Sequence, residues 1–184
     1  NFSNSLNNST LSQSNNSSKA SIIQFQIGLL ASAKEIQLKL RDLASSSDTS
    51  TSSGLQRVLQ DTTLALLRKP EFWVYANLEK GSVPFASSES TFNRISITER
   101  SKLKAELTSN YTGQIFTSKN DDANPGDSDL TNEFIAITIL LASKKELRLN
   151  GSANAEQITE ALRVLGSISS KDLIALEVIW QPEG

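Results

Sequence analysis

Hydrophobic and polar positions alternate along residues 22–30, with Ile23, Phe25 and Ile27 on one side and Gln24 and Gln26 on the other. This period of two residues predicts a half-buried β-strand. The spacing then lengthens to three or four residues over 33–44, which predicts an amphipathic helix. A second helix is predicted over 54–67, so the chain opens with one strand and two helices.

A change from helix to strand is predicted between Leu64 and Ala76. Pro70 stops the second helix, because its ring blocks helix continuation and favours an extended residue before it. The aromatic and β-branched residues that follow predict a strand over 72–78. A short helix is expected over 88–94, and the capping-box sequence Ser96-Ile97-Thr98-Glu99 predicts the start of another helix that ends near residue 107.

The second half of the chain supplies two more strands and one helix. Residues 134–142 are almost continuously apolar, which is typical of a strand covered on both faces or nearly so. A helix is predicted over 154–166 and a last strand over 173–180.

Two polar segments interrupt this pattern. Residues 1–19 are almost entirely Asn, Ser, Thr and Gln and predict a disordered linker. Residues 112–131 predict a long mobile loop. The sequence therefore predicts a single α+β domain over residues 20–184.

The order of these elements favours a ferredoxin-like plait with extra helices. Its core would be a four-stranded, mainly antiparallel sheet with helices on one face, and the first and third strands would be central. The alternative is another α+β layer of sheet and helices.

Strand alternation assigns side chains to the two faces of this sheet. The face toward the helices would be apolar: Ile23, Phe25, Ile27, Val74, Ile135, Ile137, Ile139, Leu176 and Val178. The other face would mix aromatic and polar groups: Gln24, Gln26, Trp73, Tyr75, Asn77, Thr138 and Glu177. Trp and Tyr beside polar groups are typical of interface anchors, so this set is the candidate interaction face. The alternative interpretation is ordinary sheet surface, partly covered by the long loop.

Composition excludes several kinds of chemistry. The chain has neither Cys nor His, which removes disulfides, thiolate catalysis and the Ser-His-Asp and Cys-His arrangements. Paired carboxylates could still act as in glycosidases, but the acidic residues are scattered. We therefore expect no enzyme activity, no catalytic residues and no cofactor. A net charge of −2 gives no general electrostatic reason to expect nucleic-acid binding.

Two charged clusters have simple interpretations. Oxygen ligands for Ca²⁺ gather at 121–129, but EF-hand spacing is missing and a solvated loop is expected: Asp121, Asp122, Asn124, Asp127 and Asp129. A basic cluster predicts a solvated helix surface, with contact to anionic lipid or nucleic acid as the alternative: Arg94, Arg100, Lys102 and Lys104. No apolar run approaches the roughly 18 to 20 residues needed to span a bilayer, so any membrane anchor is expected upstream.

Several short motifs occur together in a fixed order: Ile27-Gly28-Leu29-Leu30-Ala31, Asp48-Thr49-Ser50-Thr51, Leu64-Ala65-Leu66-Leu67-Arg68, Trp73-Val74-Tyr75-Ala76, Phe92-Asn93-Arg94, Glu99-Arg100-Ser101-Lys102 and Glu177-Val178-Ile179-Trp180. Taken jointly over residues 21–182, they resemble the domain of unknown function 1517, a family of cyanobacterial and chloroplast proteins that includes the plant fluctuating-light acclimation protein.

The resemblance implies a thylakoid-associated protein with a hydrophobic anchor before this domain and a role in photosynthetic light acclimation. The family has no established catalytic residues to carry over. We therefore expect the soluble domain of a membrane-anchored protein, acting as a protein-interaction or regulatory module with a protein partner or a second copy. No nucleic acid and no small-molecule substrate is identified. The alternative is a small-molecule-binding or enzymatic domain of unrecognised type.

Overall fold

The computed structural model describes residues 18–117 and 134–181, and the side chains of these residues except 103–117. The elements follow in this order: β1 (Lys19–Leu30), α1 (Lys34–Ser46), α2 (Ser52–Leu67), β2 (Trp73–Pro84), α3 (Ser88–Thr117), β3 (Phe134–Ser143), α4 (Ala155–Gly166) and β4 (Leu173–Gln181). Short 3-10 turns, η1 (Pro70–Phe72) and η2 (Phe85–Ser87), flank β2. The α+β class predicted from the sequence is confirmed.

The four strands form one sheet in the order β2-β1-β3-β4, and each neighbouring pair is antiparallel. The antiparallel sheet and the central places of β1 and β3 agree with the prediction. The plait itself does not describe the chain. A single crossover helix in a plait joins two parallel strands with a third strand between them. Here the two helices α1 and α2 connect β1 to β2, so β2 returns antiparallel and directly beside β1.

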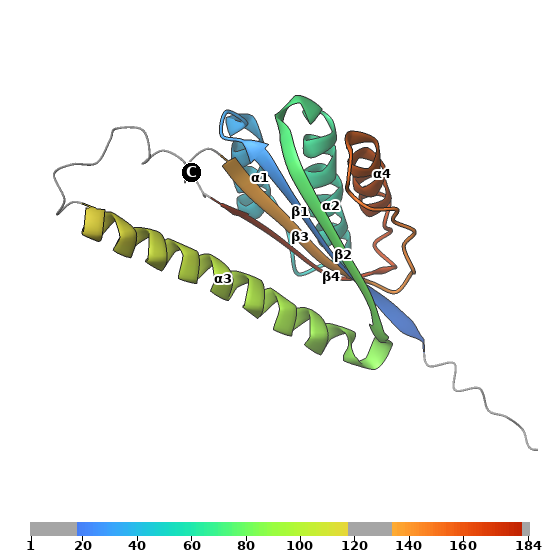
Figure 1. Ribbon diagram of the computed structural model, residues 1–184. Coiled ribbons are helices and arrows are strands. Elements are labelled where there is room, and N and C mark those ends of the chain that lie inside the picture. The colour runs from blue at the N-terminus through green and yellow to red at the C-terminus, as the bar shows by residue number, and fades with distance from the viewer. Residues whose placement is uncertain (1–17, 118–133, 182–184) are drawn as a thin grey trace, which may run out of the picture.

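Helices cover both faces of the sheet (Figure 1). Helices α1, α2 and α4 lie on one face, whereas α3 crosses the other. The expectation of helices on one face was therefore wrong. An apolar stripe at the start of α3 holds this helix on the second face, where Phe92 and Ile95 pack against Ile22 and Leu140.

The main core lies between the sheet and the layer formed by α1, α2 and α4. The predicted inward residues of β1 and β3 are fully buried there: Ile23, Phe25, Ile27, Ile135, Ile137 and Ile139. The helices contribute Leu59, Leu66 and Leu162. On the opposite side of β3, Leu140 and Ala142 are buried beneath α3, which confirms that this strand is covered on both faces.

Strands β1 and β2 are longer than their apolar patterns predict. Lys19 pairs with Pro84, and Ile22 pairs with Gly81, so β2 continues past the predicted end at residue 78. Backbone pairing extends these strands through polar positions that carry no hydrophobic signal. Lys19 thus belongs to β1 and not to the predicted linker, while residues 1–17 lie outside the described residues.

The predicted capping box at Ser96 is wrong, because α3 is a single helix from Ser88. Ser96 lies inside that helix, buried against the sheet, and its hydroxyl donates to the Glu177 carboxylate of β4. Helix α3 also continues to Thr117, past the predicted start of the mobile loop at 112. The remainder of that predicted loop, 118–131, lies outside the described residues.

Glu177 fixes α3 to the edge strand β4. Its carboxylate accepts hydrogen bonds from Ser96 and from the Arg100 guanidinium, and its side chain is only 14% exposed. Charge-assisted contacts of a shielded carboxylate are stronger than those of an exposed ion pair. One acidic residue therefore holds the helix against an otherwise narrow apolar contact.

A β-bulge separates Trp73 from the other predicted face residues. The β1–β2 register shifts between Gly28 and Leu29, so Tyr75 pairs with Gly28 while Trp73 pairs with Leu29. Trp73 packs on the main core, and its indole Nε1 donates to the Leu66 carbonyl at 3.0 Å. Val74, predicted to face the helices, is 46% exposed. Simple alternation fails at both residues because a bulge breaks the period of two.

The Tyr75 ring occupies the space above Gly28. A Cβ atom at Gly28 would lie 1.9 Å from Cε1 of Tyr75, a distance that no real contact permits. Gly81 lies on the same face of the sheet, in the neighbouring strand β2, where it pairs with Ile22. A Cβ atom at Gly81 would meet no other atom within 4 Å. The two glycines thus form a matched pair, one needed for close approach and one not.

We expect Gly28→Ala to lower the free energy of unfolding by about 1–3 kcal/mol, because the new methyl group must displace the Tyr75 ring. Gly81→Ala should change it by no more than about 1 kcal/mol. Urea unfolding of both variants measures the difference. Equal stabilities would show that the packing of Tyr75 on Gly28 does not constrain the sheet.

We expect Glu177→Ala to lower the free energy of unfolding by about 1–3 kcal/mol, because the buried Ser96 hydroxyl and the Arg100 guanidinium lose their acceptor. Hydrogen exchange should accelerate in residues 88–102 more than in β1. The control is Arg57→Ala, which removes the ion pair between the 80%-exposed Arg57 side chain and Asp61 and should cost about 0.5 kcal/mol or less. Uniform acceleration across the sheet and α3 would contradict a local role for Glu177.

Candidate functional site

Six of the seven residues of the candidate interaction face lie on the side of the sheet that α3 crosses. The register places Gln26 between Asn77 and Thr138, and Tyr75 opposite Gly28. Gln24 and Glu177 lie on either side of Leu140. Trp73 is the exception, because the bulge turns it into the main core.

The six residues differ in exposure. Thr138 is only 7% exposed, and Glu177 is occupied by Ser96 and Arg100. On the β2 side, Tyr75 is 43% exposed, Asn77 is exposed and the two glutamines are half-buried. We call this accessible part the open strip; it consists of Gln24, Gln26, Tyr75, Asn77 and Glu79.

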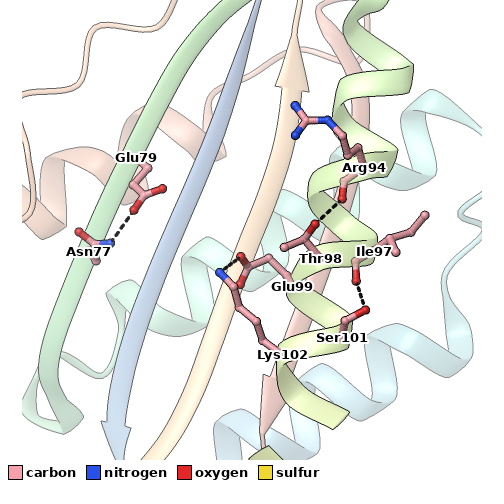
Figure 2. A network of polar contacts seen from close by, with 8 residues as sticks. All are labelled: Asn77, Glu79, Arg94, Ile97, Thr98, Glu99, Ser101 and Lys102. Atoms are coloured by element: carbon pink, nitrogen blue, oxygen red, sulfur yellow. Dashed lines mark hydrogen bonds and ion pairs between the residues drawn. The ribbon is translucent and has the colours of Figure 1, made fainter. Parts of the chain in front are cut away.

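One polar contact lies within the open strip, and another lies on α3 beside it. Asn77 donates to Glu79 at 3.5 Å along β2, and Lys102 contacts Glu99 at 2.7 Å on α3. Figure 2 shows these two pairs with β1 and β3 running between them. The strip is therefore an aromatic and amide surface bounded by charged groups, a composition suited to binding a protein surface.

The predicted basic cluster is divided by its contacts. Arg100 is bound to Glu177, and Lys102 to Glu99. Figure 2 shows the Arg94 guanidinium separate from the Glu99–Lys102 pair. The side chain of Lys104 lies outside the described residues. Two of these four cations are thus partly neutralised by acidic neighbours.

A second feature, which the sequence pattern does not reveal, is a half-open groove at the β4 edge of the sheet. It has a volume of about 310 Å³ and lies between α1, α2 and β4. Its lining is mainly apolar: Leu40, Leu43, Leu55, Val58, Leu176 and Val178. Thr62 of α2 and Trp180 of β4 also line it, and Arg100 and Glu177 lie at its charged end. We call this feature the β4 groove.

Thr62 and Trp180 each bring a buried polar atom without a partner to the β4 groove. Within the described part of the chain, Thr62 Oγ1 and Trp180 Nε1 are buried and make no hydrogen bond. Thr63, one residue later, donates to the Leu59 carbonyl at 2.9 Å, as helical threonines commonly do. The sequence gives only a weak signal that Thr62 has a role in the groove, because threonine is common on an apolar helix face without any specific role.

A capped turn leads into α2 at the end of the β4 groove. Thr51 accepts a hydrogen bond from the Gly54 amide at 3.0 Å and caps the helix. Two hydrogen bonds hold the pKa of the Asp48 carboxyl below its ordinary value. The bond from the Ser50 hydroxyl has the larger effect, and the bond from the Ser50 amide the smaller. Thr49, which lies between Asp48 and Ser50 in the sequence, lines the groove. This turn corresponds to the Asp48-Thr49-Ser50-Thr51 motif and fixes one end of the groove.

The described residues offer no grouping suited to metal chemistry. Among the side chains of residues 18–102 and 134–181, no three from His, Cys, Asp or Glu gather where they could hold a metal ion. The acidic residues at 121–129 lie outside this range, so their prediction is not tested. None of the helices described here combines the length and apolarity required to cross a membrane.

Comparison with known proteins places this chain in a family. The curated relatives include Protein FLAP1 homolog A of Synechocystis sp. (strain ATCC 27184 / PCC 6803 / Kazusa), 42% identical over 167 residues, which covers 88% of this chain and 50% of the relative. FLUCTUATING-LIGHT-ACCLIMATION protein 1, chloroplastic, of Arabidopsis thaliana is 38% identical over 169 residues, covering 90% of this chain and 42% of the relative. The chain thus spans about half the length of these relatives or less.

No solved structure matches this chain. The family described as "Protein of unknown function (DUF1517)" matches residues 19–184, which confirms the resemblance drawn from the short motifs. The chain belongs to the DUF1517 family of proteins.

Proposed function

We propose that this chain is a non-catalytic domain that binds a protein partner through the open strip and acts in light acclimation of a photosynthetic membrane. The observation that carries the proposal is the similarity to two relatives, one from a cyanobacterium and one from a chloroplast, of which the plant protein is named for acclimation to fluctuating light. The whole protein would be anchored in the thylakoid membrane through a segment outside the 184 residues.

The surface chemistry supports a binding role for the open strip. Tyr75 presents an aromatic ring with a polar group, the combination that most often anchors protein interfaces. Gln24, Gln26 and Asn77 add amides that can donate and accept hydrogen bonds. Because Tyr75 is held against Gly28 before binding, its ordering cost is already met in the free protein.

The composition supports a non-catalytic role. The sequence has no His or Cys, and its acidic residues in the described part of the chain form no candidate metal site. Proton transfer or covalent catalysis would then need carboxylates, lysines or hydroxyls arranged in a cleft. The Glu177 carboxylate is shielded, but it already binds Ser96 and Arg100.

We expect Tyr75→Ala in the full-length protein to weaken partner binding by about thirtyfold, which corresponds to about 2 kcal/mol for an aromatic anchor. Asn77→Arg should also weaken it by placing a long cation in the strip, and it leaves the Tyr75–Gly28 packing intact. Cross-linking in thylakoid membranes, followed by quantification of the proteins joined to each variant, measures this effect.

The matched control is Leu38→Arg, which adds the same side chain at a 55%-exposed position of α1, behind the sheet. It should leave partner binding unchanged. Urea unfolding verifies that each variant folds. If folded Asn77→Arg protein retains its full set of cross-linked partners, the open strip is not the interface. A loss of self-association alone would identify a second copy as the partner.

A further inference from the structure

The β4 groove lies behind the sheet from the open strip, and the proposed partner binding does not use it. It is bounded by two helices and an edge strand, and most of its lining is apolar. Its volume of about 310 Å³ falls at the lower end of the range for small-molecule sites. At roughly 30 Å³ for each water-sized group, it accommodates about ten non-hydrogen atoms.

Two residues that line this mostly apolar groove carry buried hydrogen-bonding atoms without partners. The Thr62 side chain is fully buried, and Oγ1 has no hydrogen-bond partner among the described residues. Trp180 Nε1, which can only donate, is also buried and has no hydrogen-bond partner among the described residues. Buried donors without partners are uncommon in folded proteins because each has lost its hydrogen bond to water.

The pattern differs from that of comparable residues nearby. Thr63 satisfies its hydroxyl on the Leu59 and Gln60 carbonyls, and Trp73 satisfies its indole on the Leu66 carbonyl. Thr62 and Trp180 therefore stand out among like residues of the same chain, and both line one groove. Both atoms are closed off from solvent, so a hydrogen-bond acceptor in the groove would complete them once the side chains that cover them move aside.

We propose that the β4 groove binds a small, largely apolar, uncharged molecule whose carbonyl oxygen accepts hydrogen bonds from Thr62 and Trp180. The walls formed by Leu40, Leu43, Leu55 and Val58 contact its hydrocarbon part. An uncharged ligand fits because Glu177 already neutralises Arg100, the cation at the end of the groove. A carboxylate would enter an apolar site without a free counter-charge, at a large desolvation cost.

The two tryptophans provide a direct test by NMR. The chain has two Trp residues, so a ¹⁵N-labelled sample gives two indole N–H signals, one from the groove and one from the core. Titration of the 184-residue chain with 2-decanone should shift the Trp180 indole proton downfield and saturably. The Trp73 signal should not move, because its proton is bound to Leu66. No saturable shift, or equal movement of both signals, would overturn the proposal.

Ligand chemistry separates the carbonyl from simple apolar partitioning. Decane has a similar chain without the acceptor, and decanoate carries a negative charge in place of the neutral carbonyl. We expect 2-decanone to bind more tightly than either compound. Equal binding of decane would show that Thr62 and Trp180 take no part, and tighter binding of decanoate would contradict an uncharged ligand.

Substitution of Thr62 separates binding from folding. Thr62→Val keeps the shape but removes the hydroxyl, so affinity for 2-decanone should fall by about tenfold. The Tm of the free protein should not decrease, because the hydroxyl makes no bond that is lost. Thr63→Val is the matched control and should retain affinity. Unchanged affinity in Thr62→Val protein, or a decrease in its Tm without ligand, would contradict the assignment.

Discussion

The apolar groups that β1 and β3 present on both faces of the sheet are the constraint on which the rest of the fold depends. Their odd-numbered residues fill the main core, whereas Ile22, Leu140 and Ala142 face the opposite direction. Covering only one face would leave these apolar groups in water, at a cost of about 0.8 kcal/mol for each CH₂ group left exposed. Helix α3 is therefore required on the second face. Because it is a single helix, it covers that face only partly and leaves the open strip beside it.

Much of this arrangement can be predicted from hydrophobic period alone. The alternation around Phe25 and the helical spacing over 33–44 correspond directly to β1 and α1, and the apolar run of β3 correctly indicates two covered faces. These signals work because each side chain responds to local burial. The strand order depends on how the two helices α1 and α2 reverse the chain, and no local pattern contains that information.

The errors at Trp73 and Ser96 have the same physical origin. Both residues fit a local rule, strand alternation in one case and a helix cap in the other. Tertiary contacts override these rules: a bulge turns Trp73 toward Leu66, and the Glu177 carboxylate binds Ser96 inside a continuous helix. For this reason, only part of the candidate site can be predicted from the sequence. Tyr75 and Asn77 follow regular pairing and were placed correctly on one face, whereas the β4 groove joins residues from α1, α2 and β4 that no sequence spacing connects.

Strand β4 links the two surfaces of the molecule. Among the described strands it pairs with β3 alone, at the edge of the sheet, so its position depends strongly on the helices packed against it. Leu176 and Val178 face the β4 groove, while Glu177 between them binds α3, whose side chains border the open strip. A ligand in the groove would contact Leu176 and Val178, which flank the residue that holds α3. Filling the groove would therefore restrain β4, and through Glu177 it would also restrain α3. By the reciprocity of linked equilibria, a partner that binds beside α3 would in turn alter the affinity of the groove.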